Sequence, residues 1–136
     1  MELTESARRV FAADRFAALA GIEIDAVGDG ESQCSMPLDE RHRNARGAAM
    51  GGALFTLADL AAAVAGNSAD LDAGDELHWV SLDSTVHYLS PALGPRIEAR
   101  CQALKRGRTT ALYQTVLLCN DKKVAIVETT MMRTQG

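Results

Sequence analysis

Hydrophobic residues follow two different patterns along the chain. From Ala53 to Ala65 the sequence A-L-F-T-L-A-D-L-A-A-A-V-A is apolar on every side of a helix, which predicts a long helix buried in the fold. From Trp79 onward, apolar and polar residues alternate, as a half-buried strand requires. In that segment Val80, Leu82, Val86 and Tyr88 alternate with Ser81, Asp83, Thr85 and His87.

Further strands are predicted on both sides of the helix. They are Ile22–Val27 and Gln33–Leu38 before it, and Arg96–Lys105, Thr109–Cys119 and Lys123–Arg133 after it. The connections between successive strands are short, which indicates antiparallel neighbours. A meander of five to six antiparallel strands and one apolar helix pack best when the sheet curls round the helix. The predicted class is therefore α+β, with a curved sheet wrapped around one long central helix.

The remaining segments suggest one domain covering residues 1–136. Ser6 to Leu19 mixes charged and apolar residues and predicts an amphipathic helix that ends near Gly21 and packs on an outer edge. The polar segments Asp39–Ala49 and Asn67–Glu76 are predicted loops on either side of the central helix. No repeat or low-complexity linker divides the chain.

Charge and cysteine content narrow the classes of function. The 136 residues contain 14 Lys and Arg against 18 Asp and Glu, and this net charge of −4 argues against a nucleic-acid partner. The three cysteines lack C-x-x-C spacing, and the first twenty residues contain no apolar run long enough for a signal peptide or membrane span. We therefore expect a cytoplasmic protein without membrane association. The three histidines lack metal-ligand spacing, so no metal or other cofactor is predicted.

The segment from Asn44 to Asp59, N-A-R-G-A-A-M-G-G-A-L-F-T-L-A-D, contains the strongest chemical signal. Two adjacent glycines, Gly51 and Gly52, stand where the apolar helix begins, and Asp59 is the one carboxylate within it. An ionised carboxylate is unfavourable in an apolar setting, so Asp59 is predicted to have either a polar cavity or a chemical role.

This segment resembles the hotdog-fold acyl-CoA thioesterases, in particular the branch that includes phenylacetyl-CoA thioesterase. That branch has the pattern N-x-x-G-x-x-H-G-G-x-x-x-x-L-A-D, and the chain matches it at Asn44, Gly47, Gly51, Gly52 and Leu57-Ala58-Asp59. The resemblance continues through Ala61, Asn67-Ser68, Tyr88-Leu89-Ser90-Pro91 and the hairpin Lys105–Thr109. It departs at Met50, where the family commonly has His, and Met neither titrates nor forms strong hydrogen bonds.

The spacing within the helix favours a site shared between subunits. Gly51 and Asp59 are eight residues apart, so about 12 Å separates them along a helix. Because one thioester cannot contact both, they act on the same substrate only if they come from different subunits. The resemblance likewise implies a two-fold homodimer with sites at its interface, often paired again into a homotetramer.

By resemblance, the expected activity is hydrolysis of an acyl-CoA to a free acid and coenzyme A. Asp59 would act as general base or as nucleophile, and the sequence leaves both open. The backbone N–H of Gly51 and the side-chain amide of Asn44 from the other subunit would polarise the thioester carbonyl. Ser81 stands where related enzymes hold the water, and Thr85, expected on the same strand face, is an alternative.

Binding of the acyl-CoA is assigned to two further groups of residues. Gly52, Met50 and Phe55, together with Leu54, are expected to line the acyl pocket, and Met50 would shift the preference toward aliphatic or larger aromatic acyl groups. Arg106 and Arg108, with Lys105, would contact the phosphates of coenzyme A at a hairpin tip.

Each of these assignments has a structural alternative. The glycine pair would also allow a strand to approach the helix closely, and Asp59 would also suit a site where loop N–H groups satisfy it. Asn44 is also typical of a loop or a helix cap. The basic hairpin would also suit a turn that faces solvent.

Other classes of function also remain open. A non-catalytic protein that binds acyl-CoA is the main alternative. A hydratase is disfavoured because no His lies in or directly before the helix. A purely structural module would bind no acyl-CoA at all.

Overall fold

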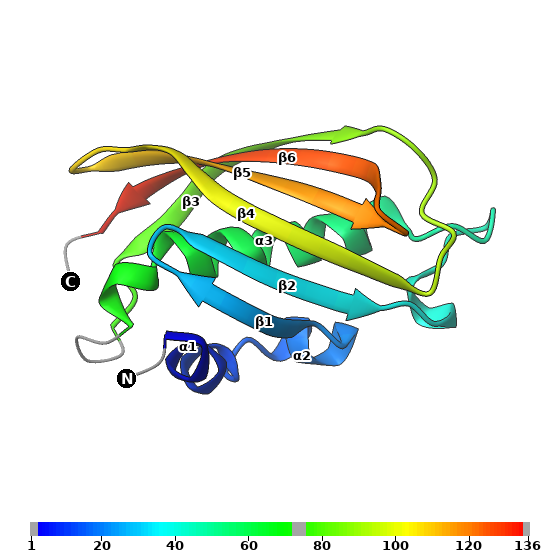
Figure 1. The fold of residues 1–136 in the computed structure, drawn as a ribbon, viewed down its shortest axis with the longest axis horizontal. Coiled ribbons are helices and arrows are strands. Elements are labelled where there is room, and N and C mark those ends of the chain that lie inside the picture. The colour runs from blue at the N-terminus through cyan, green and yellow to red at the C-terminus, as the bar shows by residue number, and fades with distance from the viewer. Residues whose placement is uncertain (1–2, 72–75, 135–136) are drawn as a thin grey trace.

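The computed structural model describes residues 3–71 and 76–134 and shows a six-stranded antiparallel sheet curved around one long helix (Figure 1). The helices are α1 (Leu3–Phe11), α2 (Arg15–Ala20) and α3 (Gly51–Gly66), with short 3₁₀ turns η1 (Glu40–His42) and η2 (Ser68–Asp70). The strands are β1 (Glu23–Gly28), β2 (Glu31–Pro37), β3 (Trp79–Tyr88), β4 (Arg96–Arg106), β5 (Thr110–Cys119) and β6 (Lys122–Arg133), in the spatial order β1-β2-β4-β5-β6-β3. This architecture confirms the predicted α+β class, with six strands. Part of the predicted loop Asn67–Glu76, residues 72–75, lies outside the described residues.

The N-terminal segment forms two helices where the sequence predicted one. Helix α1 ends at Phe11 and α2 begins at Arg15, and α2 ends at Ala20, followed by the C-cap Gly21, whose φ of 82° is left-handed. As predicted, this segment packs on an outer edge of the sheet, where α1 lies against β1 (Figure 1). Arg8 Nε donates a 2.9 Å hydrogen bond to the carbonyl of Ile24, so α1 satisfies part of the β1 edge.

Helix α3 is largely buried under the sheet, as its apolar sequence predicts. Nine of its residues are buried, and the helix packs on β2, β4 and β5 together. One side nevertheless stays open in the single chain. Gly52 and Asp59 are exposed on that side, and Phe55, Thr56 and Ala63 are partly exposed. The expectation that the whole helix lies buried is therefore wrong at Asp59 in the single chain, because no element among residues 3–71 and 76–134 fully covers that side of α3.

The faces of β3 also differ from the prediction. The register between β3 and β6 shifts after Ser81, where Leu82 is an extra residue on β3. Residues directly opposite in antiparallel strands point to the same face of the sheet. Ser81 lies opposite buried Met131, on the side of α3, whereas Thr85 lies opposite Glu128, on the other side. The expectation that Ser81 and Thr85 share a face is wrong, because the β-bulge reverses the alternation between them.

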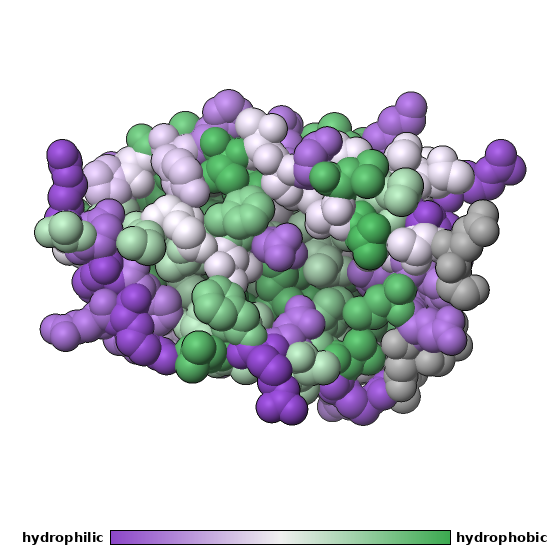
Figure 2. All heavy atoms as spheres, turned by 180° about the vertical axis from the view of Figure 1, so that it is seen from behind, coloured by the Kyte–Doolittle hydropathy of each residue, from purple (hydrophilic) through white to green (hydrophobic). Residues whose placement is uncertain are grey.

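One edge strand of the sheet is covered by a helix and the other is not. Strand β1 is covered by α1, whereas β3, ten residues long, pairs only with β6 among the described residues. Its exposed side chains include Val80, Leu82 and Tyr88. Seen from behind, the molecule shows hydrophobic side chains gathered across the middle of the face and hydrophilic ones at the rim (Figure 2). No helix within residues 3–71 and 76–134 is long and apolar enough to span a membrane.

Candidate active site

The loop before α3 is built around Asn44. The Asn44 Oδ1 atom accepts hydrogen bonds from the backbone N–H groups of Arg46 at 2.9 Å and Ala48 at 3.2 Å. Gly47, at a left-handed φ of 85°, completes the turn by donating to the Asn44 carbonyl at 2.9 Å. The loop therefore uses the oxygen of the Asn44 amide, while its NH₂ group has no hydrogen bond within the described residues. Both interpretations of Asn44, loop former and donor, are compatible with this geometry.

The start of α3 is held by His42 and left uncapped by Met50. The Met50 N–H donates to the His42 carbonyl at 2.7 Å, and the Met50 carbonyl accepts from Ala53 at 2.9 Å and Leu54 at 3.1 Å. Met50 occupies the N-cap position, where its thioether provides no side-chain cap, and it is 55 % exposed. The N–H groups of Gly51 and Gly52 consequently have no partner within the described residues. Free N–H groups at a helix N-terminus suit a carbonyl oxygen or an anion.

Tyr88, the last residue of β3, packs directly on Gly51. Its hydroxyl donates a 3.0 Å hydrogen bond to the Gly51 carbonyl. A Cβ atom at Gly51 would lie only 2.9 Å from Cζ of the Tyr88 ring, so the ring could keep its present place only against glycine. At Gly52, by contrast, a Cβ atom would meet nothing within 4 Å. The close-approach interpretation of the glycine pair therefore holds for Gly51 alone.

An open cleft of about 610 Å³ lies beside the start of α3. Its volume is within the range of pockets that bind small molecules and cofactors. Two of the predicted site residues, Asn44 and Gly51, line it together with predicted pocket residue Leu54. The full lining is Asn44, Arg46, Ala48, Ala49, Gly51, Leu54, Tyr88, Leu89, Ser90, Pro91, Ala92 and Leu93.

Asp59 lies outside this cleft, two turns further along the open side of α3. The pKa of its carboxyl group is raised, chiefly because neighbouring atoms exclude part of the surrounding water and secondarily because of the negative charge of Asp14. No hydrogen bond or ion pair to the Asp59 carboxylate is present among the described residues. The alternative interpretation, an acid satisfied by loop N–H groups, finds no support in the single chain.

Ser81 is exposed near the far end of β3, on the same side of the sheet as α3. The two elements run antiparallel, since Tyr88 contacts the start of α3 and Asn67, just after its end, donates to the Trp79 carbonyl at 3.1 Å. Ser81 and Asp59 therefore both lie away from the cleft at the N-terminus of the helix. Phe55, on the open side of α3, packs partly against the core and does not line the cleft.

The basic hairpin lies at the opposite end of α3. Arg106 forms a 2.8 Å ion pair with Asp29, which lowers the pKa of that carboxyl group. The turn that contains Asp29 is tied to the end of α3, because the Gly30 N–H donates to Ser68 Oγ at 2.8 Å. Arg108 is exposed and has no ion pair within the described residues. Since α3 is 16 residues long, roughly 24 Å separates this hairpin from the cleft in one chain.

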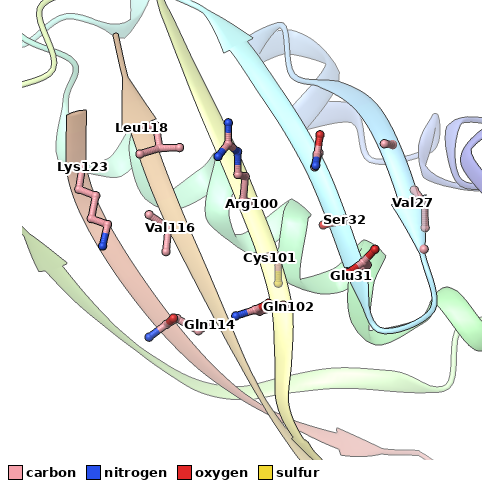
Figure 3. Close-up of a pocket in the computed structure, with 13 residues that line it drawn as sticks. Val27, Glu31, Ser32, Arg100, Cys101, Gln102, Gln114, Val116, Leu118 and Lys123 are labelled. Atoms are coloured by element: carbon pink, nitrogen blue, oxygen red, sulfur yellow. The ribbon is translucent and has the colours of Figure 1, made fainter. Parts of the chain in front are cut away.

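A second cavity, of about 510 Å³, lies on the face of the sheet that carries no helix (Figure 3). Side chains from neighbouring strands line it, among them Arg100 and Gln102 of β4, Gln114 and Val116 of β5, and Lys123 of β6. None of the predicted site residues belongs to it. The described residues also contain no cluster of three or more His, Cys, Asp or Glu side chains arranged to hold a metal ion.

Among the cleft residues that the sequence analysis did not assign a role, Tyr88 and Arg46 carry polar groups suited to a ligand. Tyr88 contacts Gly51 across 37 positions of sequence, so no local pattern reveals the contact. Arg46 adds a positive charge to the cleft wall, and its place two residues after Asn44 in the motif is the only sequence signal for it.

A six-stranded antiparallel sheet curved around one long helix is the architecture of a hotdog-fold protein. The chain belongs to the Thioesterase superfamily, whose family model matches residues 46–126. This membership confirms the predicted family and fold, and it confirms the prediction that the chain is an enzyme of the thioesterase class.

Named relatives agree with this assignment. The chain is 34 % identical over 103 residues to acyl-coenzyme A thioesterase 13 of Homo sapiens, covering 75 % of this chain and 70 % of that protein. It is 28 % identical over 120 residues to acyl-coenzyme A thioesterase PaaI of Escherichia coli, covering 88 % and 81 % of the two chains. The solved structure of the E. coli PaaI protein superposes with a TM-score of 0.85 at 27 % identity, covering 98 % of this chain and 97 % of that one.

Proposed function

We propose that this chain hydrolyses an acyl-CoA thioester to a free acid and coenzyme A. The observation that carries the proposal is the cleft at the start of α3, which Asn44 and Gly51 line together, each with an N–H donor that has no partner within residues 3–71 and 76–134. Such donors suit the oxygen of a thioester carbonyl, which gains negative charge when the carbonyl carbon is attacked. The names of the relatives support the acyl-CoA as substrate.

In the proposed reaction, water adds to the thioester carbonyl carbon and the carbon–sulfur bond breaks. Asp59 takes a proton from the water, and that proton is transferred to the sulfur of the departing coenzyme A. The alternative is attack by the Asp59 carboxylate itself, which gives an anhydride that water then hydrolyses. The raised pKa of Asp59 makes its carboxylate a stronger base than an ordinary aspartate. Ser81 is proposed to hold the attacking water.

The site is proposed to form between two subunits of a homodimer. Within one chain, Asp59 lies about 12 Å along α3 from Gly51 and outside the cleft. The unpaired edge of β3, exposing Val80 and Leu82, offers ten residues for antiparallel pairing with a second copy. Such edges are usually covered in stable proteins. We propose that the two-fold axis at this edge also places the open side of one α3 against the partner's cleft.

Two such dimers are proposed to form a tetramer. The face of the sheet opposite α3 has no covering helix and carries apolar Val116 and Leu118 beside charged Arg100 and Lys123 (Figure 3). This uncovered face is the surface proposed for contact with a second dimer.

Residues outside the cleft are also proposed to bind the substrate. Gly52, Met50 and Phe55 are proposed to contact the acyl-CoA on the open side of α3. Arg108, exposed and without an ion pair among residues 3–71 and 76–134, is proposed to contact a phosphate of coenzyme A from the other subunit. Arg106 would need to share its guanidinium between that phosphate and Asp29.

The test is release of free thiol from a panel of aromatic and aliphatic acyl-CoAs, followed with a disulfide dye. The native protein is compared with Asp59→Asn, each checked for folding and oligomeric state. Turnover by the native protein that falls in the variant by about 10²- to 10⁴-fold supports the proposal. Binding of acyl-CoA without turnover by the native protein would instead establish the non-catalytic alternative.

A further inference from the structure

The hydroxyl of Tyr88 is the one side-chain donor from another element that reaches the start of α3 in the described residues. It donates to the Gly51 carbonyl at 3.0 Å, although Tyr88 belongs to β3, 37 residues along the chain. Its ring lies against Gly51 so closely that a Cβ atom there would be 3.0 Å from the tyrosine oxygen. Tyr88 is also 54 % exposed and lines the same cleft as Asn44.

The bond to Tyr88 fixes the orientation of a peptide group. The carbonyl of Gly51 and the N–H of Gly52 belong to one planar unit, so holding the carbonyl also holds the N–H, which points the opposite way. An amide whose carbonyl accepts a hydrogen bond becomes a stronger donor through its own N–H. Neither Gly51 nor Gly52 contributes a side chain that would stiffen the backbone, so an external contact has the larger effect here.

We propose that Tyr88 is a positioning residue for thioester hydrolysis: it holds the Gly51–Gly52 peptide so that the Gly52 N–H points, beside the Gly51 N–H, at the substrate carbonyl. This inference rests on the proposed function. Tyr88 acts through the backbone and takes no proton from the substrate. Its contribution is therefore expected in kcat, since the donors interact most strongly with the charge that develops during reaction.

The decisive variant is Tyr88→Phe, which keeps the ring against Gly51 and removes only the hydroxyl. We expect kcat to fall about three- to tenfold, the effect of one neutral hydrogen bond, with KM changed less than about twofold. The matched control is Thr134→Val. It removes a 2.8 Å hydrogen bond from a hydroxyl to the His78 carbonyl, next to the other end of β3. We expect that control to keep the native kcat.

A second readout does not depend on turnover. A ketone analogue of acyl-CoA, in which CH₂ replaces the sulfur, is bound to each protein, and the stretching frequency of its carbonyl is recorded. We expect the native protein to lower this frequency from its value in water, and Tyr88→Phe to move it part of the way back.

Two results would overturn the inference. One is an unchanged kcat together with an unchanged carbonyl frequency in Tyr88→Phe. The other is an equal loss of kcat in Tyr88→Phe and Thr134→Val, which would assign the effect to general loosening of β3. Absence of turnover in the native protein would refute the thioesterase proposal instead, and the carbonyl frequency would still decide whether Tyr88 positions the donors.

Discussion

Asn44 and Gly51 line the same cleft, seven residues apart in sequence, and both keep an N–H donor free of partners within the described residues. The loop achieves this by using only the oxygen of the Asn44 side chain, in bonds of 2.9 Å and 3.2 Å to Arg46 and Ala48. Asp59, the acid that the proposed reaction requires, lies outside this cleft. The proposed reaction therefore requires that a second subunit bring its Asp59 to this cleft.

The two glycines are expected to respond oppositely to alanine. Gly52→Ala fills open space and removes the flexibility of glycine from a helix, so stability should rise by about 0.5–1 kcal/mol. Gly51→Ala should lower stability, because its Cβ atom would lie 2.9 Å from the Tyr88 ring. Thermal unfolding of both variants checks this contrast. If substrate lies against Gly52, then Gly52→Ala also loses kcat/KM despite its greater stability; full activity would remove Gly52 from the binding site.

Met50 is expected to influence the choice of acyl group. Its thioether is 55 % exposed beside the free N–H groups of α3, where the related family commonly has His. Replacing it by His makes this side of the site more polar, so Met50→His should raise the ratio of activity on phenylacetyl-CoA to activity on a medium-chain acyl-CoA. Thiol release from both substrates measures the ratio. An identical ratio in the native protein and the variant would exclude Met50 from acyl recognition.

Ser81 and Thr85 are expected to differ because the bulge at Leu82 places them on opposite faces of β3. Ser81→Ala removes a hydroxyl from the side that faces α3, and if that hydroxyl holds the attacking water, kcat should fall by about tenfold. Thr85→Val alters the other face and should leave kcat unchanged. Steady-state kinetics on one good substrate separates the two. A loss confined to Thr85→Val would mean that the substrate approaches from the opposite side of the sheet.

The raised pKa of Asp59 gives a defined pH dependence. Because Asp59 must be ionised to act as a base, kcat/KM should fall as the pH drops through this raised pKa, above the value of about 3.9 for an ordinary aspartate. Asp14→Asn removes the neighbouring negative charge and should shift the acidic limb to lower pH. The pH profiles of kcat/KM of the two proteins measure the shift. An acidic limb at the same pH in both proteins would show that Asp14 does not influence the pKa of the base.

The raised pKa of Asp59 also makes the stability of the folded protein depend on pH. A carboxyl group whose pKa is higher in the folded than in the unfolded state favours folding most when it is protonated, and this contribution is lost as the pH rises through the folded-state pKa. Asp59→Asn should therefore be at least as stable as the native protein at neutral pH. Its advantage should disappear at pH values below the pKa of the unfolded state. Thermal unfolding of both proteins across this pH range measures the difference.

The fold was predictable because its two signals are local and strong. The apolar run from Ala53 to Ala65 specified a central helix, and alternation after Trp79 specified strands joined by short connections. The break between α1 and α2 was missed because residues 12–14 contain no glycine or proline to mark it. The bulge at Leu82 was missed because it depends on pairing with β6, which a single strand does not encode.

Only the part of the site that lies within the motif from Asn44 to Asp59 was predictable from the sequence. Asn44 and Gly51 meet in the cleft because a short loop joins them, so their spacing was informative. The contact of Tyr88 with Gly51 joins distant segments and leaves no pattern in either. Exposure of Asp59 was not foreseen because apolar residues all around α3 indicate burial, without showing whether this chain or a partner provides the cover. The cytoplasmic location and the homotetramer stay predictions.

In the proposed dimer, each active site combines Asp59 of one subunit with Asn44 and Gly51 of the other. Mixing two inactive variants tests this arrangement. Asn44→Asp keeps the oxygen that accepts the two loop hydrogen bonds and loses the amide donor, while Asp59→Asn loses the carboxylate. Each variant alone should hydrolyse acyl-CoA at least about 10²-fold more slowly than the native protein.

When the two variants are co-expressed with different affinity tags, the mixed dimers are purified and thiol release is measured. Each mixed dimer contains one site with both native residues, so we predict that its activity recovers to about half that of the native dimer if its two sites act independently. Mixed dimers that form but remain as inactive as either parent would contradict the shared site.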